Sequence, residues 1–346
     1  MFIGDFEITN NSKVFIIAEL SANHNGSKEV AIETIRAAKR AGADCIKFQT
    51  YTADSMTLDS EKEDFRINGT IWHGQKLFDL YKEAYTPWEW HEELFKIALE
   101  EGLICFSSPF DIEAVDFLET LNVPAYKIAS FEITDIPLIE YVASKDKPII
   151  ISTGIANFDD INRAIKACKK AGNEQLILLK CTSSYPSRIE DANLSVIPEL
   201  SKEFNVLSGL SDHTLGSTTA IVATVLGARV IEKHFILDRS IGGPDASFSM
   251  DESEFSEMVK LIRDAENSLG KNSFKLTESQ LKGRDFSRSI YISADIKKGE
   301  VISKENIKIV RPGFSLHPQY YDQILGKIIN KDLKLGDRLK LDDIEF

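Results

Sequence analysis

Two histidines follow two successive apolar runs of the chain, His213 in the string GLSDHT and His234 in the string VIEKHF. The runs 206–210 and 228–231 predict short buried strands, and residues 217–226 between them predict a crossover helix. A right-handed crossover makes the two strands parallel and brings their carboxyl ends together, so both imidazoles can bind one metal ion. The pair therefore predicts a metal site. Hydrogen-bonded core histidines are the alternative, which a single histidine would favour more than a pair does.

Two acidic residues lie beside these histidines in the sequence, Asp212 and Glu232. Because side chains alternate along a strand, we expect both acids to point away from the side that carries the histidines. A third acid, Glu19, ends the apolar run FIIAE. Burial after four apolar residues raises the pKa of a carboxyl and suits it to proton transfer. A structural acid paired with a lysine is the alternative for Glu19.

Strand-like apolar runs recur along the chain, and segments with helical spacing separate them. The helical segments 29–40, 88–101 and 159–171 each end at or next to a glycine. This alternation predicts an α/β fold, a (β/α)8 TIM barrel, with active-site residues at the carboxyl ends of its strands. An open doubly wound sheet is the structural alternative. The eight runs are 15–19, 43–49, 103–107, 125–129, 148–152, 175–181, 206–209 and 228–232.

Polar side chains occupy nearly every predicted strand end, which is more than a scaffold alone needs. Together they predict a polar pocket that can bind anions. Each serine alone is equally consistent with a turn-forming role, so the prediction belongs to the set. Besides Glu19 and the two histidines, the set contains Lys47, Gln49, Ser108, Lys127, Ser130, Ser152, Ser183 and Tyr185.

The chain divides into regions of different pattern. We expect a barrel domain over 1–268 that includes an N-terminal hairpin, a polar linker over 269–284, and a small β-rich domain over 285–346. A long insertion at 52–85 is expected to lie on the active rim and to shape specificity. His73 in this insertion is open to a substrate role. Trp88 and Trp90, which follow the insertion, are expected to pack against the barrel.

Composition restricts the class of partner. The net charge of -13 disfavours nucleic acid and anionic membrane surfaces, and no apolar run approaches the roughly 20 residues that span a bilayer. The four cysteines show no C-x-x-C pairing, so buried reduced thiols are expected. The chain start lacks the basic segment and long apolar run of a secretory signal. These features predict a cytoplasmic protein.

Nine ordered strings resemble those of the sialic acid synthase family, which condenses phosphoenolpyruvate with an N-acetylated sugar to form a nine-carbon 2-keto acid. The string VRPG at 310–313 is similar to the antifreeze-like (SAF) domain that ends these enzymes. The insertion at 69–91 resembles that of the pseudaminic acid synthase branch, whose sugar is a 2,4-diacetamido-2,4,6-trideoxy-altrose. N-acetylneuraminate and legionaminate synthases are the alternatives. The strings are IAELSANH, IKFQT, FSSPF, PAYKIAS, ISTG, CTSSYP, GLSDHT, EKHF and GPD.

The resemblance implies a role for each site residue. Glu19 is the acid/base, and His213 and His234 hold a divalent ion, usually Mn2+, with Co2+ or Mg2+ also suited to such a site. A domain-swapped homodimer is implied, in which Arg311 reaches the sugar in the neighbouring subunit. The phosphoenolpyruvate ligands are Lys47, Ser108, Lys127, Ser130, Ser152, Ser183 and Ser211, and the sugar ligands are Gln49, His73, Tyr185, Asp245 and Arg311.

One position departs from the family pattern, because Ser183 stands where the sialic acid branch has Asn. The contact that this amide makes in relatives is therefore not carried over. Two other functions stay open: a non-catalytic barrel that binds sugars or anions, and another phosphoenolpyruvate-dependent aldol-type synthase. The small domain at 285–346 argues against the other phosphoenolpyruvate-dependent synthase.

Overall fold

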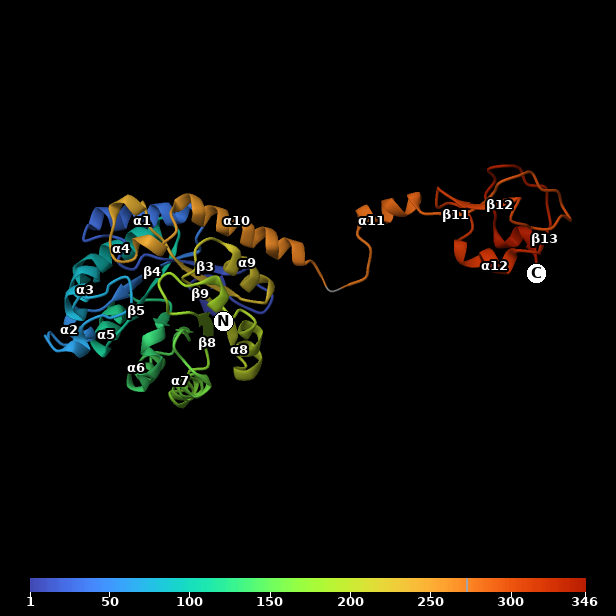
Figure 1. Ribbon diagram of the computed structural model, residues 1–346. Helices are drawn as coiled ribbons and strands as arrows, with labels where there is room; N and C mark the ends of the chain where they lie inside the picture. Colours follow the sequence, from blue (N-terminus) through green and yellow to red (C-terminus); the bar gives the residue numbers. More distant parts are fainter. Residues whose placement is uncertain (272) are drawn as a thin grey trace. The chain divides into compact units, whose positions relative to one another are not determined.

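The computed structural model describes residues 1–271 and 273–346. It separates into two compact units, Met1–Gly270 and Lys271–Phe346. Figure 1 labels the helices and strands of both units. No helix among the described residues has the length and apolar character that a membrane span requires.

The first unit is a closed barrel of eight parallel strands in the order β10-β3-β4-β5-β6-β7-β8-β9. The barrel closes where β10 pairs with β3, with Val230 opposite Phe15 and His234 opposite Glu19. The predicted TIM barrel is confirmed, and the open sheet is wrong. The strands are β3 (Phe15–Glu19), β4 (Cys45–Thr50), β5 (Ile104–Pro109), β6 (Tyr126–Ile128), β7 (Ile149–Ser152), β8 (Leu176–Cys181), β9 (Leu207–Asp212) and β10 (Val230–His234).

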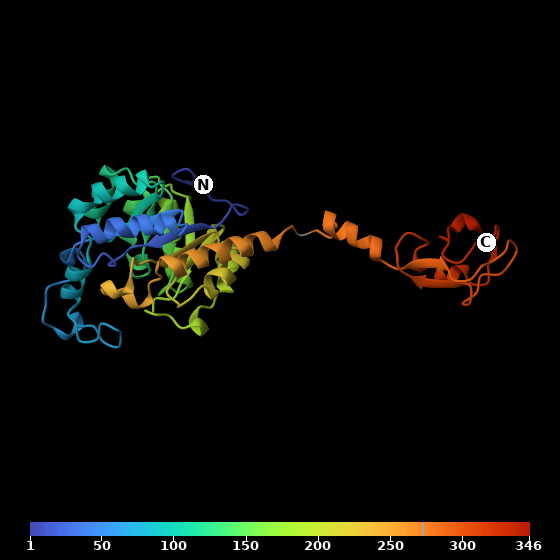
Figure 2. The same cartoon turned by 90° about the horizontal axis from the view of Figure 1, so that it is seen from above.

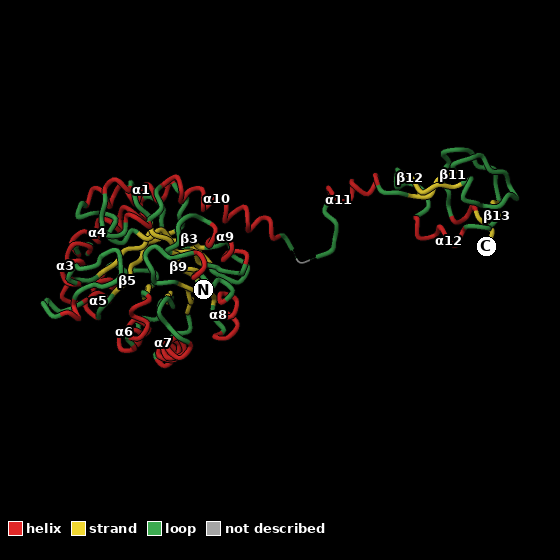
Figure 3. Tube along the Cα trace, viewed as in Figure 1, coloured by secondary structure: helices red, strands yellow, loops and turns green. Residues whose placement is uncertain are grey.

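Helices surround the strands, as the red and yellow tubes of Figure 3 show. In α7, a capping box between Asn157 and Asp160 fixes the start, and Ile161, Ile165 and Cys168 form the buried face. The last helix of the first unit, α10, packs beside α9 and α1 (Figures 1 and 2). The barrel helices are α1 (Lys28–Arg40), α4 (Trp88–Glu100), α5 (Ile112–Thr120), α6 (Ile136–Ala143), α7 (Phe158–Lys170), α8 (Val196–Phe204), α9 (Thr218–Val225) and α10 (Glu252–Leu269).

The predicted N-terminal hairpin is present as β1 (Phe2–Ile3) paired with β2 (Phe6–Glu7). Ile3 is fully buried in the barrel core. The turn at Gly4 lies against Ile104, the first residue of β5, since a Cβ on this glycine would be 3.2 Å from the Ile104 side chain. The hairpin therefore covers the amino ends of the strands, opposite the end where the predicted site residues lie.

The insertion contains α2 (Ala53–Met56) and α3 (Leu77–Ala84). Its loop is closed by a backbone hydrogen bond of 2.9 Å from Ile67 N–H to the Gln75 carbonyl. The Lys76 ammonium ties the loop to the preceding segment through Asp59, at 2.7 Å, and Glu61, at 3.0 Å. Short 3-10 helices lie at Glu63–Phe65, Ser130–Thr134, Ile189–Asp191, Arg239–Ile241, Ala246–Phe248, Arg284–Phe286, Pro318–Tyr320 and Leu341–Asp343.

The second unit has its own small core, which contains Ile290, Ile307, Ile324 and Ile344. Strands β11 and β12 pair antiparallel, and so do β13 and β14. The β-rich character predicted for this region is thus confirmed. The elements of this unit are α11 (Glu278–Gly283), β11 (Ser289–Ile292), β12 (Ile307–Val310), α12 (Tyr321–Ile324), β13 (Ile328–Ile329) and β14 (Ile344–Glu345).

Candidate active site

Four charged side chains meet inside the barrel, and all four are buried: Glu19 of β3, Lys47 of β4, Lys127 of β6 and Glu232 of β10. Lys47 forms an ion pair with Glu19. Glu232 lies between the two lysines, with carboxylate oxygens 3.8 Å from the Lys47 Nζ and 3.7 Å from the Lys127 Nζ. Both ammonium groups thus contact one carboxylate, and two ammonium groups in such an arrangement can bind a multiply charged anion.

Serine hydroxyls orient these charges. Lys47 donates to the Ser108 Oγ at 3.2 Å, and Lys127 donates to the Ser152 Oγ at 2.7 Å. Ser211 donates to the Glu232 carboxylate at 3.0 Å. The structure therefore brings together five of the seven residues predicted to bind phosphoenolpyruvate in one connected network.

Burial raises the pKa of Glu19 to about 7, although Lys47 opposes the shift. Burial also acts on Glu232, but Lys127 and Lys47 outweigh it and lower the pKa of that carboxyl. Desolvation lowers the pKa of the Lys127 ammonium. Glu19 is thus the carboxyl of this cluster that exchanges a proton near neutral pH, which is the property required of an acid/base.

The remaining two predicted ligands, Ser130 and Ser183, face Gly154 after β7. Gly154 donates its N–H to the Ser130 Oγ at 3.1 Å. A Cβ at position 154 would lie 2.1 Å from the Ser183 Oγ and 2.7 Å from the Ser130 Oγ. Only glycine allows this approach, so Gly154 is part of the site. Its place after a strand was visible in the sequence, but the side chains opposite it were not.

The two predicted metal ligands face each other. The rings of His213 and His234 are both buried, with centroids 5.3 Å apart. The His213 Nδ1 lies 3.0 Å from the Thr182 carbonyl oxygen, which only accepts, so this nitrogen carries a proton. Burial opposes the charged form of this ring, but Cys181 and the Thr182 carbonyl outweigh it and raise the pKa of His213. Burial and the neighbouring cations lower the pKa of His234 well below its usual value, which keeps this ring neutral. Neutral imidazoles are the form that binds metals.

The Nδ1 of His234 is buried and has no hydrogen-bond partner among the described residues. The Oδ2 of Asp245 lies 3.6 Å from it. No group of three or more His, Cys, Asp or Glu side chains within residues 1–271 and 273–346 is arranged to hold a metal ion. The donors fit an ion that takes two imidazoles and completes its shell with oxygen from water, substrate or a shifted carboxylate.

Asp212 and Glu232 are both expected to point away from the side that carries the histidines. The structure confirms this for Asp212, but it is wrong for Glu232. Residues two apart on a strand share a face, so Glu232 points into the barrel together with His234. Asp212 points outward and binds Lys233, whose Nζ lies 2.6 Å from the Asp212 Oδ2. Thr219 of α9 also donates to this oxygen, at 2.7 Å. Glu232 is thus a site residue that strand alternation, applied correctly, would have found.

A cavity of about 660 Å³ opens beside the histidines. Gln49, Tyr185, His234 and Asp245 line it, and Gln49 donates to the Glu19 carboxylate at 3.0 Å. Glu132 also lines the cavity, and its Oε2 is buried without a hydrogen-bond partner in the described chain. Burial raises the pKa of Glu132 to about 7. The sequence did not single out Glu132, because it lies in a short 3-10 helix after β6.

Of the other two predicted sugar ligands, His73 lies outside the cavity and Arg311 belongs to the second unit. His73 is exposed, accepts a hydrogen bond of 3.3 Å from the Gly69 N–H, and does not line the cavity. The residues before it, Ile71 and Trp72, line the cavity instead. Arg311 is an exposed residue of the second unit and directly follows β12. Trp88 packs as expected, stacking on Phe117 with centroids 4.8 Å apart.

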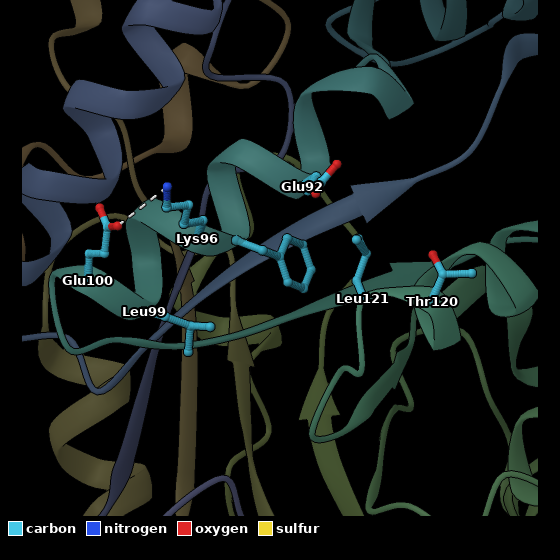
Figure 4. A pocket seen from close by; sticks show the side chains of 7 residues that line it. Glu92, Lys96, Leu99, Glu100, Thr120 and Leu121 are labelled. Carbon is cyan, nitrogen blue, oxygen red and sulfur yellow. Dashed lines mark ion pairs between the residues drawn. The ribbon is translucent and has the colours of Figure 1, made fainter.

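Another hollow, of about 500 Å³, lies on the outside of the barrel between α4 and the end of α5 (Figure 4). Its charged side chains, Glu92, Lys96 and Glu100, all belong to α4. Lys96 pairs with Glu100 at 3.8 Å, and both side chains are exposed. Because all of its charged side chains come from one helix, this hollow lacks the convergent polar groups of a catalytic site.

The closed (β/α)8 barrel carries a buried cluster of two lysines and two glutamates and a histidine pair at the carboxyl ends of its strands. Together these features define a barrel enzyme. Residues 34–274 match the NeuB family, and residues 287–345 match the SAF domain. The chain belongs to the NeuB family.

Relatives with known names are similar over the whole chain. The chain is 52% identical to a pseudaminic acid synthase of Campylobacter jejuni, covering 100% of both, and 49% identical to the one of Helicobacter pylori, covering 95% and 97%. Identity to the N,N'-diacetyllegionaminic acid synthase of Legionella pneumophila is 39%, with 96% and 94% covered. Among solved structures, an N-acetylneuraminic acid synthetase from Leptospira borgpetersenii in complex with citrate has a TM-score of 0.74 at 31% identity, with 82% and 94% covered.

Proposed function

We propose that this chain is a pseudaminic acid synthase. It condenses phosphoenolpyruvate with 2,4-diacetamido-2,4,6-trideoxy-L-altrose and releases inorganic phosphate, giving a nine-carbon 2-keto acid. The observation that carries the proposal is the buried cluster of Glu19, Lys47 and Lys127 beside the facing pair His213 and His234. Identity of 49% to 52% with named pseudaminic acid synthases over nearly the whole chain favours this substrate over the neuraminate and legionaminate precursors.

The two lysines are the binding site proposed for the phosphate and carboxylate of phosphoenolpyruvate. Glu232 lies between the two ammonium groups, and Glu19 also pairs with Lys47. Ser108 and Ser152 accept hydrogen bonds from the two lysines, and Ser130 accepts one from the Gly154 N–H. The two ammonium groups and the serine hydroxyls can bind the phosphate and carboxylate of this substrate, and the Glu19 and Glu232 carboxylates beside them lower the net charge of the site.

His213 and His234 are the residues that would hold a divalent ion, with Asp245 beside them as a nearby oxygen donor. Mn2+ is the ion that we propose, and Co2+ or Mg2+ also suits this donor set. When bound, the ion supplies Lewis-acid polarisation of the sugar aldehyde. Tyr185, whose ring lies 4.4 Å from that of His213, and Gln49 position the sugar.

The reaction joins C3 of phosphoenolpyruvate to the aldehyde carbon, and the aldehyde oxygen takes up a proton to become a hydroxyl. C2 then has oxocarbenium character, and a water molecule adds to it while Glu19 accepts the water proton. The C2–O bond to the phosphate breaks, and the bridging oxygen leaves with inorganic phosphate. Gln49 holds the Glu19 carboxylate at 3.0 Å in the orientation that this step requires.

We also infer a cytoplasmic homodimer in which Arg311 of one subunit contacts the sugar bound to the other. A small unit with a core of its own, carrying an exposed guanidinium, is compatible with that role. Sedimentation equilibrium gives the oligomeric state, and mixing an Arg311→Ala variant with a Glu19→Gln variant tests the exchange. Recovered activity in the mixture supports swapping, and activity equal to the sum of the separate variants contradicts it.

The function is tested with purified protein, Mn2+ and phosphoenolpyruvate, together with the diacetamido sugar or N-acetylmannosamine. We expect phosphate release and a product of the condensed mass with the diacetamido sugar. Absence of phosphate with any sugar would refute the proposal, and a preference for N-acetylmannosamine would favour a neuraminate synthase.

The metal role has a readout of its own. The double variant His213→Ala, His234→Ala should lose bound Mn2+, measured by the electron paramagnetic resonance of the free ion. His317→Asn in the second unit is the matched control. Unchanged metal content and unchanged sugar binding in the double variant would favour the non-catalytic barrel.

A further inference from the structure

The carboxylate of Asp212, the residue before His213, is buried and accepts four hydrogen bonds. Its Oδ1 accepts from the N–H and from the hydroxyl of Thr214, each at 2.9 Å. Its Oδ2 accepts from the Thr219 hydroxyl of α9 at 2.7 Å and from the Lys233 ammonium at 2.6 Å. All of these residues are at most 3% exposed. We call Asp212, Thr214, Thr219 and Lys233 the outer network, because they lie where the sheet meets α9.

The outer network holds the backbone on both sides of His213. The hydrogen bond from the Thr214 N–H to the Asp212 carboxylate closes a turn in which His213 is the central residue. Lys233 donates to the same carboxylate and, at 2.5 Å, to the Thr214 carbonyl. One ammonium group of β10 therefore binds both sequence neighbours of His213, and so fixes where this histidine leaves the end of β9.

Lys233 in turn directly precedes the second predicted metal ligand, His234. In the parallel pairing of β9 with β10, Lys233 lies opposite Asp212. Successive side chains of a strand point to opposite faces, so this ion pair lies on the outer face of the sheet, whereas the two imidazoles face each other on the inner side. A short chain of bonds thus runs from His213 through Asp212 and Lys233 to His234.

A buried ion pair is often no more stabilising than well-packed apolar side chains of the same volume. It does restrict the relative position of its partners, because each hydrogen bond has a preferred length and direction. A metal site needs such restriction, since its ligands must be held within about 0.5 Å of their productive positions.

We propose that the outer network positions His213 and His234 for the divalent ion, with Lys233 as its central residue. Lys233 and Asp212 are positioning residues, because they act through the backbone of the two histidines and do not touch the ion. This inference rests on the proposed function, since it takes the two histidines as the metal ligands.

The affinity for Mn2+ without substrates tests the proposal, measured by the electron paramagnetic resonance of the free ion. We expect Lys233→Met to weaken Mn2+ binding about 10-fold, as for other residues that orient metal ligands. Thr219→Val removes one hydroxyl from the network and keeps the ion pair, so it should lose less affinity. Arg263→Met is the control, because it breaks the ion pair of 3.0 Å with Asp44, next to the first residue of β4 at the opposite end of the barrel. Its Mn2+ affinity should equal that of the parent.

The double variant Asp212→Leu, Lys233→Met separates positioning from stability. Two apolar side chains leave no unpaired buried charge, so part of the stability should return. The turn around His213 still lacks its carboxylate acceptor, so Mn2+ affinity should stay low. The visible absorption of bound Co2+, which reports the geometry of the ligands, should change in both Lys233 variants and stay unchanged in Arg263→Met.

Unchanged affinity in both Lys233 variants would overturn the proposal. Affinity that returns together with stability in the double variant, or that falls equally in Arg263→Met, would also overturn it, because the network would then act only on folding. The experiment needs no sugar and no turnover. Absence of phosphate release from the unsubstituted protein with any sugar would therefore refute the synthase and not the outer network.

Discussion

The Lys127 ammonium of β6 lies 3.7 Å from the Glu232 carboxylate of β10, on the opposite side of the barrel. These two strands are four positions apart in the eight-stranded order, so the ion pair crosses the barrel interior. Glu232 therefore holds the place near both lysines that an anionic substrate must share. If the two lysines bind phosphoenolpyruvate as proposed, the contact links the stability of the barrel to the affinity for that substrate.

Glu232→Gln should destabilise the ligand-free protein by about 3 kcal/mol or more, because breaking a buried pair leaves ammonium charge uncompensated. Phosphoenolpyruvate should then stabilise the variant more than the unsubstituted protein. Urea unfolding with and without phosphoenolpyruvate measures both effects. Glu140→Gln is the control, since its ion pair with Lys170 is exposed and should contribute less than about 1 kcal/mol. Equal stability of the Glu232→Gln variant and the parent would contradict the role of Glu232.

Stability should depend on pH through Glu19. Its pKa rises from 4.5 to about 7 on folding because of burial. A carboxyl whose pKa is higher in the folded state than in the unfolded state stabilises the fold. This contribution is complete at pH values below the unfolded-state pKa and is lost as the pH rises to about 7. The difference in unfolding free energy between the parent and Glu19→Gln should therefore change by roughly 3 kcal/mol across that window, with the parent losing stability toward high pH. A difference that stays constant with pH would show that Glu19 does not titrate there.

Gly154→Ala should weaken phosphoenolpyruvate binding without unfolding the barrel. The new methyl group would displace the hydroxyls of Ser130 and Ser183. We expect the KM for phosphoenolpyruvate to rise about 10-fold, in line with the usual penalty for overpacking. Gly283→Ala is the control, because nothing lies within 4 Å of a Cβ there. An unchanged KM in steady-state kinetics would exclude these two serines from the phosphoenolpyruvate site.

Lys233→Met should destabilise the barrel by about 3 to 5 kcal/mol, because the Asp212 carboxylate would stay buried without its cation. Adding Asp212→Leu should restore part of that stability, since two apolar side chains leave no unpaired charge. Chemical denaturation followed by circular dichroism provides the comparison. Lys297→Met, which removes an ion pair with Asp332 between two exposed side chains, should have a much smaller effect on stability. A double variant less stable than Lys233→Met would contradict this account.

The fold could be predicted because its signals are local. Apolar runs such as 15–19 and 148–152 lie within a residue or so of β3 and β7, and glycines mark the helix ends. The histidine pair was also predictable, since adjacent parallel strands bring their carboxyl ends together.

What the sequence could not give depends on contacts between distant segments. Glu132 and Trp72 line the cavity from a 3-10 helix and a loop, where no periodicity fixes the direction of a side chain. The sequence favours His73 for its chemistry, but this side chain is turned toward the Gly69 N–H, and Trp72 lines the cavity. Gly154 matters only because Ser130 and Ser183, from two other segments, approach it.

The most direct test of the synthase uses phosphoenolpyruvate labelled with 18O at the oxygen that bridges C2 and phosphorus. The protein is incubated with this substrate, Mn2+ and the diacetamido sugar, and both products are analysed by mass spectrometry. Cleavage of the C–O bond after attack of water at C2 predicts that all of the label appears in inorganic phosphate. Label retained in the nine-carbon acid, or label released without any sugar present, would contradict the proposed reaction.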